Sequence, residues 1–204
     1  MKLLTFVDVH GDMKQIKQLC DTANAEDVDL VICAGDITNF GTNQKAIVKG
    51  IAASGRPTLI IHGNHENYET LEADCEKYDN MIFLHSASFE IDDYLFFGYG
   101  GGGFSYTDES FESISDEFSS AIKIKKKENK KLKTILIVHG PPYGTDADFT
   151  NDTHVGNKDY TDFIQSKSVD LVVCGHIHEA AGSDQKRGKS RIINPGPEGR
   201  IVVI

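Results

Sequence analysis

The sequence predicts an α/β fold, and two observations support this prediction. Short apolar runs alternate along the chain with longer segments in which apolar residues recur at helical spacing. A chain of 204 residues is also long enough to bury a sizeable core without disulfide bonds. It contains no internal repeat and no interdomain linker, so we expect residues 1–204 to form a single domain.

The first half of the chain alternates regularly between the two kinds of segment. Runs rich in Leu, Ile and Val predict three strands, at 3–7, 30–33 and 57–61. Apolar residues at helical spacing predict three helices, at 13–20, 43–53 and 68–78. Each predicted strand is followed by a predicted helix, as expected of an α/β domain.

The second half begins with a change of this rhythm. Three consecutive runs, at 81–84, 88–91 and 94–98, have no helical segment between them, which predicts an antiparallel stretch. Asp92 and Asp93 form its expected hairpin turn. The later segments predict helices at 109–129 and 158–166, strands at 134–138, 171–174, 191–194 and 200–204, and a polar loop at 143–157.

The charge of the chain limits its partners. The formal net charge of −10 argues against stable binding to nucleic acid or to an anionic membrane, because the overall field repels phosphates. A basic cluster at 123–133 could form a patch for polyanions. It also ends a predicted helix, where lysines favour the negative end of the helix dipole, and we prefer that interpretation.

The cysteines and the apolar runs indicate a cytoplasmic protein. Cys20, Cys33, Cys75 and Cys174 show no Cys-x-x-Cys spacing, and Cys33 and Cys174 end apolar runs. We interpret them as small buried hydrophobic residues in a reducing compartment. No apolar stretch reaches transmembrane length, and no signal peptide is expected at the N-terminus.

A run of four glycines at 100–103 opens a polar loop at 99–110. It does not fit a nucleotide-binding loop, because no Gly-Lys-Ser/Thr follows it. We expect a flexible lid over the functional site, with Phe104 or Tyr106 in contact with the substrate; the alternative is a plain surface turn.

Five predicted strands end in side chains that bind metal ions well. Open α/β sheets bind ligands beyond the carboxyl ends of their strands, so these ends are expected to meet in one crevice. One Asp-x-His pair is more often structural, but five such ends in register predict a metal site. The residues are Asp8 and His10, Asp36, Asn64 and His65, His139, and His176 and His178. Asp8 and His10 are expected to project together from an extended strand.

These blocks resemble those of the calcineurin-like metallophosphoesterases. The family pattern Asp-x-His, Gly-Asp, Gly-Asn-His-Glu, His and Gly-His-x-His occurs here at 8–10, 35–36, 63–66, 139 and 175–178. The match covers nearly the whole chain. Within the family, the sequence looks most like the small prokaryotic branch related to cyclic-nucleotide phosphodiesterases. The resemblance implies a four-layer α-β-β-α sandwich of two mixed β-sheets flanked by helices.

The resemblance also implies a centre for two divalent ions. By position, Asp8, His10, Asp36 and His178 would hold one ion, and Asp36, Asn64, His139 and His176 the other, with Asp36 as the bridge. Such a centre hydrolyses phosphate esters by attack of a metal-bridging hydroxide. Nitrogen and oxygen ligands without thiolate suit Mn²⁺, which we expect, with Fe, Zn²⁺, Ni²⁺ and Mg²⁺ as alternatives.

His65 is the candidate general acid for the leaving oxygen. It follows Asn64 by one residue, so in extended geometry its side chain points away from the ions and toward the substrate. Asp12 and Glu66 could orient the ligating or catalytic imidazoles. Equally, they could be ordinary carboxylates at helix starts.

The sequence departs from the protein phosphatases of this superfamily in one block. Those enzymes have Asp-Arg after Gly-Asp, whereas Gly35-Asp36 is followed here by Ile37-Thr38-Asn39-Phe40. The arginines, Arg56, Arg187, Arg191 and Arg200, lie outside the matching blocks. A phosphoprotein substrate is therefore disfavoured, and Asn39 is the candidate partner that orients His65.

We therefore expect a dinuclear phosphoesterase that hydrolyses a small phosphodiester, with a cyclic nucleotide as one candidate. A phosphomonoesterase of the same mechanism is the alternative within the enzyme class. A non-catalytic metal-binding scaffold of the same fold is the alternative outside it. The sequence does not determine the oligomeric state.

Overall fold

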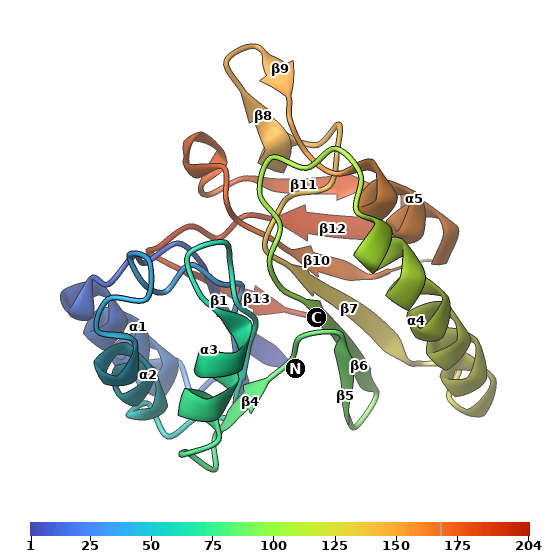
Figure 1. The fold of residues 1–204 in the computed structure, drawn as a ribbon. Coiled ribbons are helices and arrows are strands. Elements are labelled where there is room, and N and C mark those ends of the chain that lie inside the picture. Colours follow the sequence, from blue (N-terminus) through green and yellow to red (C-terminus); the bar gives the residue numbers. More distant parts are fainter. Residues whose placement is uncertain (168) are drawn as a thin grey trace.

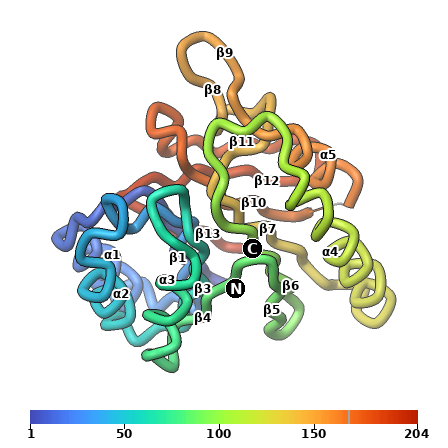
Figure 2. The backbone as a smooth tube through the Cα atoms, in the orientation of Figure 1, coloured from blue at the N-terminus to red at the C-terminus, as the bar shows by residue number. Residues whose placement is uncertain are grey.

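The computed structural model describes residues 1–167 and 169–204. Two β-sheets pack face to face, and helices cover the outer face of each sheet (Figure 1). Figure 2 follows the same path as a tube, with α1, α2 and α3 on one side and α4 and α5 on the other. The layers therefore run α-β-β-α, and both sheets are mixed, which confirms the predicted fold class.

The first sheet has the strand order β13-β1-β2-β3-β4. Adjacent strands from β1 to β4 pair in parallel, and β13 pairs antiparallel with β1. The strands are β1 (Lys2–Phe6), β2 (Leu30–Cys33), β3 (Thr58–Ile60), β4 (Met81–Phe83) and β13 (Arg200–Val203). The helices that cover it are α1 (Met13–Ala25), α2 (Gln44–Ala52) and α3 (Tyr68–Cys75).

The second sheet has the order β11-β12-β10-β7-β6-β5, with parallel pairs in its centre and antiparallel pairs at both edges. Its strands are β5 (Ala87–Ile91), β6 (Tyr94–Tyr99), β7 (Lys133–Val138), β10 (Leu171–Val173), β11 (Asp184–Arg187) and β12 (Ser190–Ile193). It is covered by α4 (Glu109–Glu128) and α5 (Lys158–Lys167). A separate hairpin pairs β8 (Phe149–Thr150) with β9 (Thr153–His154). Two short 3₁₀ helices are η1 (Asp146–Asp148) and η2 (His178–Ala180).

The core explains why the central strands are almost continuously apolar. Successive side chains of a strand point to opposite faces of its sheet. In β1, Leu4 and Phe6 pack against the helices, whereas Leu3 faces the second sheet. In β7, Leu136 packs against the helices and Ile135 faces the first sheet. Both faces of these strands are buried, so neither face has a polar repeat.

The structure corrects the sequence analysis at two places. Strand β4 pairs in parallel with β3 in the first sheet, so only β5 and β6 form the predicted antiparallel pair, around the turn at Asp92 and Asp93. Strand β11 and the β8–β9 hairpin were not predicted. They are short, and Phe149 is their one large apolar residue, so they lack the apolar runs that marked the other strands.

The cysteines behave as small hydrophobic residues. Cys33, Cys75 and Cys174 are buried free thiols, and burial raises the pKa of each. Among the described residues, the helices are all too short or too polar to cross a membrane.

Candidate metal centre

The candidate ligands lie in loops that follow five strands of the two sheets. Asp8 and His10 follow β1, Asp36 follows β2, Asn64 and His65 follow β3, His139 follows β7, and His176 and His178 follow β10. The Asp8 N–H donates to the carbonyl oxygen of Gly35 (3.2 Å), and the Gly175 N–H donates to the carbonyl oxygen of His139 (2.8 Å). The His176 N–H, in a loop of the second sheet, donates to Asp8 Oδ2 (2.9 Å) in a loop of the first. The carboxyl ends of strands from both sheets thus converge at one edge of the sandwich.

The backbone of these loops is not extended. Strand β1 ends at Phe6, and Asp8 and His10 have left-handed φ angles of 58° and 42°. Asp36 (50°) and His176 (69°) share this conformation, which is uncommon for residues with a Cβ. The expectation that Asp8 and His10 project from one strand face is therefore wrong. Their side chains converge because the loop turns, and such strain is often found at functional sites.

Hydrogen bonds of Glu66 connect the loop after β2 with the loop after β3. Its buried carboxylate accepts hydrogen bonds from the backbone N–H groups of Asp36 (3.0 Å), Gly63 (3.0 Å) and Thr38 (2.9 Å), and from the Thr38 hydroxyl (2.7 Å). Close packing there also requires glycine, because a Cβ on Gly63 would lie 2.0 Å from Asp36 Oδ1. Glu66 thus holds loop backbone and does not orient an imidazole.

Asp12 has the simpler of its two predicted roles. Its side chain accepts hydrogen bonds from the N–H groups of Lys14 (2.9 Å) and Gln15 (3.0 Å) and caps α1. This is an ordinary N-cap, which stabilises the first turn of the helix.

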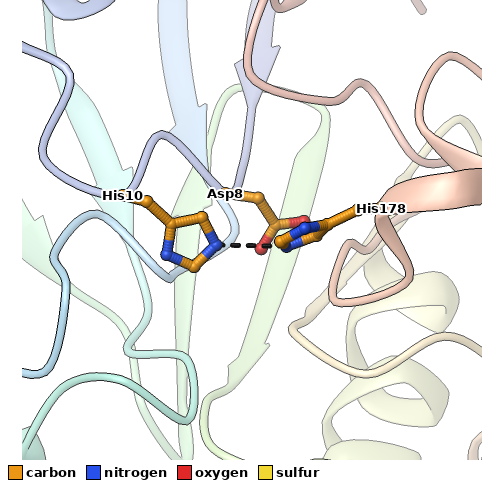
Figure 3. A group of neighbouring side chains, drawn as sticks. All are labelled: Asp8, His10 and His178. Carbon is orange, nitrogen blue, oxygen red and sulfur yellow. Dashed lines mark hydrogen bonds between the residues drawn. The ribbon is translucent and has the colours of Figure 1, made fainter.

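One group of side chains consists of Asp8, His10 and His178 (Figure 3). A potential ligand atom of each lies within 4.8 Å of the others. The Nε2 atoms of His10 and His178 are 3.1 Å apart, and the His10 Nδ1 atom lies 3.3 Å from the carbonyl oxygen of Thr38. A proton on Nδ1 satisfies that carbonyl and leaves the Nε2 lone pair of His10 free to bind a cation.

A second group consists of Asp36, His139 and His176. His139 is fully buried, and its Nδ1 atom lies 2.9 Å from the carbonyl oxygen of Ala34. Its Nε2 atom faces two oxygens, Asn64 Oδ1 at 3.0 Å and Asp36 Oδ2 at 3.3 Å. With the proton on Nδ1, three lone pairs would face one another, an arrangement that a cation stabilises.

Asp36 also belongs to a third group, with His10 and His65. The Asp36 Oδ2 atom lies 4.0 Å from Nε2 of His10 and 3.8 Å from Nε2 of His65. The carboxylate therefore stands between the side chains expected to bind the two ions. The His65 side chain was expected to point away from the metal ligands. Instead, its Nε2 atom lies close to Asp36 and belongs to the same group.

The pKa shifts follow from burial and from close charges. Burial disfavours charge on Asp36, but the hydrogen bond and positive charge of His139, with a smaller effect of His65, outweigh it and lower the pKa of Asp36 to about 2. Burial likewise opposes charge on His139, yet Asp36 raises its pKa. Burial raises the pKa of Asp8, and burial together with His139 lowers the pKa of His176 to about 4.

The donor set fits divalent cations. In the described part of the chain, four buried side-chain atoms have no hydrogen-bond partner, and three of them are Asp8 Oδ1, His65 Nδ1 and His176 Nε2. A buried polar atom without a partner destabilises the fold by about 1–3 kcal/mol. Binding a cation removes this cost for the Asp8 oxygen and the His176 nitrogen, which are ligand types that Mn²⁺, Fe and Zn²⁺ accept.

Two aromatic residues lie at the rim of the site. Phe104, in the glycine loop, is 75% exposed and packs edge-on against the His176 ring at 4.6 Å between centroids. Phe40 is stacked on His65. Phe104 was predicted to lie here. The contact between Phe40 and His65 was not predicted, because an isolated aromatic residue in a loop has no periodic pattern. Asn39, the predicted partner of His65, donates instead to the carbonyl oxygen of His10 (3.3 Å).

An α-β-β-α sandwich with histidine and carboxylate groups at its strand ends is the architecture of a metallophosphoesterase. The chain belongs to the calcineurin-like phosphoesterase family, whose sequence profile matches residues 1–180. This range contains every candidate ligand.

Two curated relatives resemble the chain at low identity. A probable glycerophosphodiester phosphodiesterase of Arcobacter nitrofigilis is 29% identical over 160 residues, which cover 75% of this chain and 58% of the relative. The probable purple acid phosphatase 20 of Arabidopsis thaliana is 28% identical over 192 residues, which cover 82% of this chain and 43% of the relative. The chain thus spans about half the length of these relatives.

A solved structure has the same fold. The Thermus thermophilus protein TT1561 superposes with a TM-score of 0.74 over 97% of this chain and 90% of its own, at 15% sequence identity.

Proposed function

We propose that the chain is a dinuclear metal-dependent phosphoesterase that hydrolyses a small phosphodiester. The observation that supports this most strongly is the position of Asp36, which belongs to one candidate metal-binding group with His139 and His176 and to another with His10 and His65. A carboxylate has two oxygens and a negative charge, so it can bridge two cations. Residues 1–204 act as one domain in this proposal, because the two sheets share one buried interior.

The ligand assignment follows the groups. Asp8, His10, Asp36 and His178 hold one ion, and Asp36, Asn64, His139 and His176 hold the other. Mn²⁺ is the preferred ion, with Fe, Zn²⁺, Ni²⁺ and Mg²⁺ as alternatives. When bound, two such ions lower the pKa of a water molecule and neutralise charge on the phosphate.

The remaining chemistry comes from the chain itself. His65 acts as the general acid, with its Nε2 atom directed toward the site, and donates a proton to the leaving oxygen. Asp36 keeps its charge because the neighbouring histidines lower its pKa. Glu66 keeps the loops of Asp36 and His65 together.

A diester substrate is favoured over a monoester for two reasons. One relative is a probable glycerophosphodiester phosphodiesterase. The described arginines are also engaged away from the ligands: Arg187 with the carbonyl oxygens of Tyr143 and Gly144, Arg191 and Arg200 with Asp184, and Arg56 with Asp27. No arginine in this set is placed to clamp the additional charge of a monoester. The likeness to a purple acid phosphatase keeps the monoesterase as the second candidate.

We also propose that the protein works in the cytoplasm and, given its net charge of −10, without stable binding to nucleic acid. The direct test is hydrolysis of bis-p-nitrophenyl phosphate and p-nitrophenyl phosphate with added Mn²⁺. We expect faster turnover of the diester, and loss of both activities on chelation. A faster monoester reaction would favour the phosphatase. No turnover with any of the candidate ions would favour the non-catalytic scaffold.

A further inference from the structure

We propose that Phe40 is a positioning residue, which fixes the His65 imidazole by stacking, because no described residue offers a hydrogen-bond partner to the His65 Nδ1 atom. This inference rests on the proposed function, in which His65 is the general acid. It assigns a role to the segment after Gly35-Asp36, the block in which the sequence departs from the protein phosphatases.

A general acid needs a fixed ring, because its proton must reach the leaving oxygen at hydrogen-bond distance. The usual device is a partner on the second ring nitrogen, which fixes both tautomer and orientation. The Nδ1 atom of His65 is buried and has no such partner among the described residues. Asn39, which could have supplied one, donates to the carbonyl oxygen of His10 instead.

Phe40 provides a different constraint. Its ring is 4.0 Å from the His65 ring between centroids and is inclined to it by only 17°. The His65 ring also contacts the His10 ring, at 4.7 Å between centroids and inclined by 60°. The imidazole therefore has two ring contacts, one with a nearly parallel phenyl ring and one with a tilted histidine. Stacked and edge-to-face aromatic pairs attract each other beyond the effect of buried area.

The exposure and the backbone conformation of Phe40 indicate that packing of the core does not account for its contact with His65. Its side chain is 78% exposed, so it contributes little to the core. Its backbone has φ 48°, in the left-handed region that bulky residues rarely occupy. An exposed, conformationally strained phenylalanine on the candidate catalytic ring has a cost in the fold, which suggests a functional reason.

The loop that carries Phe40 is braced against the loop that carries His65. The Thr38 hydroxyl donates to Glu66 (2.7 Å), which lies next to His65, and accepts from the N–H of Gly41 (2.9 Å), which lies next to Phe40. Phe40 and His65 also line the same open groove on this side of the centre, together with Lys45 and Asn67. The outer face of Phe40 therefore borders the space next to the general acid.

The test compares side chains that keep a flat ring with one that keeps only apolar volume. Phe40→Tyr and Phe40→Trp retain stacking, whereas Phe40→Leu removes it without opening a core cavity. None of these changes relieves the left-handed backbone as glycine would. Phe149→Leu is the matched control, because Phe149 is also an exposed aromatic residue (46%) that packs against a histidine, His154, which is not a candidate ligand.

The first readout is leaving-group dependence. With an alkyl diester, whose alcohol must be protonated as it leaves, we expect Phe40→Leu to lower kcat by about 10-fold, part of the ~10²–10⁴-fold of a general acid. With bis-p-nitrophenyl phosphate, which needs no proton, the change should be under about 3-fold. The aromatic variants should restore most of the alkyl-ester rate, and Phe149→Leu should match the wild type. Equal losses for both esters, or Leu as active as Tyr, would overturn the proposal.

The second readout does not depend on activity. In zinc-loaded protein, the His65 ring protons, assigned with His65→Gln, should show an upfield NMR displacement from the Phe40 ring. The displacement should persist in Phe40→Tyr and vanish in Phe40→Leu at unchanged zinc content. Its absence from the wild type would overturn the positioning role. If the displacement is present but the wild type hydrolyses no ester, the proposed function has failed while the stacking stands.

Discussion

At the scale of single residues, Asp36 and His65 differ in the contacts that they make within one candidate site. Asp36 lies between the groups that should bind metal, with Oδ2 3.3 Å from Nε2 of His139. His65 contacts Asp36 through its backbone N–H, which donates to Oδ1 (2.9 Å), while its ring stacks on Phe40. Removing the His65 side chain should therefore leave the loop contacts to Asp36 in place.

His65→Ala is expected to separate chemistry from assembly. The variant should keep its metal content and its fold, because the backbone N–H to Asp36 remains. With an alkyl diester, loss of the proton donor should lower kcat by ~10²-fold or more. With bis-p-nitrophenyl phosphate the loss should be much smaller. Steady-state kinetics on both esters checks this; equal losses would show that His65 positions the phosphate instead.

Glu66→Gln tests the carboxylate that fastens the loops. The amide NH₂ would face N–H groups where the carboxylate accepts four hydrogen bonds. We expect the free energy of unfolding of the metal-free protein to fall by about 1–3 kcal/mol, measured by urea denaturation. Metal affinity should fall as well, because Asp36 loses its anchored N–H.

The control for this change is Asp12→Asn. Asparagine caps a helix about as well as aspartate, so this variant should unfold like the wild type. If Glu66→Gln were as stable and bound metal as tightly as Asp12→Asn, Glu66 would have no part in holding the loops.

At the scale of elements, the loop 99–110 is the segment most open to experiment. Two hydrogen bonds join it to loops of the first sheet: the Gly101 N–H donates to the carbonyl oxygen of His62 (2.9 Å), and the Gly100 N–H donates to His85 Nδ1 (3.0 Å). Phe104 reaches His176, while Tyr106 packs on Tyr143. The two aromatic residues of the loop thus have different surroundings, and its action as a mobile lid stays a prediction.

Phe104→Ala should lower kcat/KM for the active ester by about 2- to 10-fold, because one aromatic contact is worth about 0.5–1.5 kcal/mol. Tyr106→Ala should have the smaller effect, since its ring contacts Tyr143 and the Lys158 ammonium, 4.5 Å from the ring centroid, and not a candidate ligand. Measuring kcat/KM for both variants tests whether the loop contacts the substrate. Unchanged values for both would identify the loop as a plain surface turn.

The elements also show how far the sequence determines the structure. The central strands were predictable because burial on both faces demands continuous apolar runs. The candidate ligands were predictable because they follow those runs. The left-handed backbone of Asp8 and His10 was not, because local sequence gives no indication of φ at residues that tertiary contacts hold. The polar edge strand Asp184–Arg187 was missed because an edge strand needs no apolar pattern.

At the scale of the whole molecule, a charge cluster connects the two sheets. Asp184, on β11 of the second sheet, accepts hydrogen bonds from Arg191 (2.7 and 2.9 Å) and from Arg200 (2.7 Å), which lies on β13 of the first sheet. The hydrogen bond and charge of Arg191, with the smaller effect of Arg200, lower the pKa of Asp184.

A group whose pKa is lower in the folded state stabilises the fold above its unfolded pKa, and this contribution is lost as the pH falls through the folded value. Asp184→Asn should therefore lower the free energy of unfolding by about 0.2–1 kcal/mol at pH 7, since the cluster is partly exposed. Below pH ~3.9 the difference from the wild type should shrink. Urea denaturation at pH 7 and at pH ~3 measures it, and an equal difference at both pH values would exclude the charge as its cause.

The central claim is that two ions share Asp36, and the most direct measurement is the number and position of ions in crystals of the metal-loaded protein, by anomalous scattering and elemental analysis. We expect two ions per chain in contact with opposite sides of the Asp36 carboxylate. Asp36→Ala should lose more metal than His10→Ala or His176→Ala, each of which removes a ligand of one ion only. A single ion per chain under saturating metal, or two ions with no common ligand, would contradict the account.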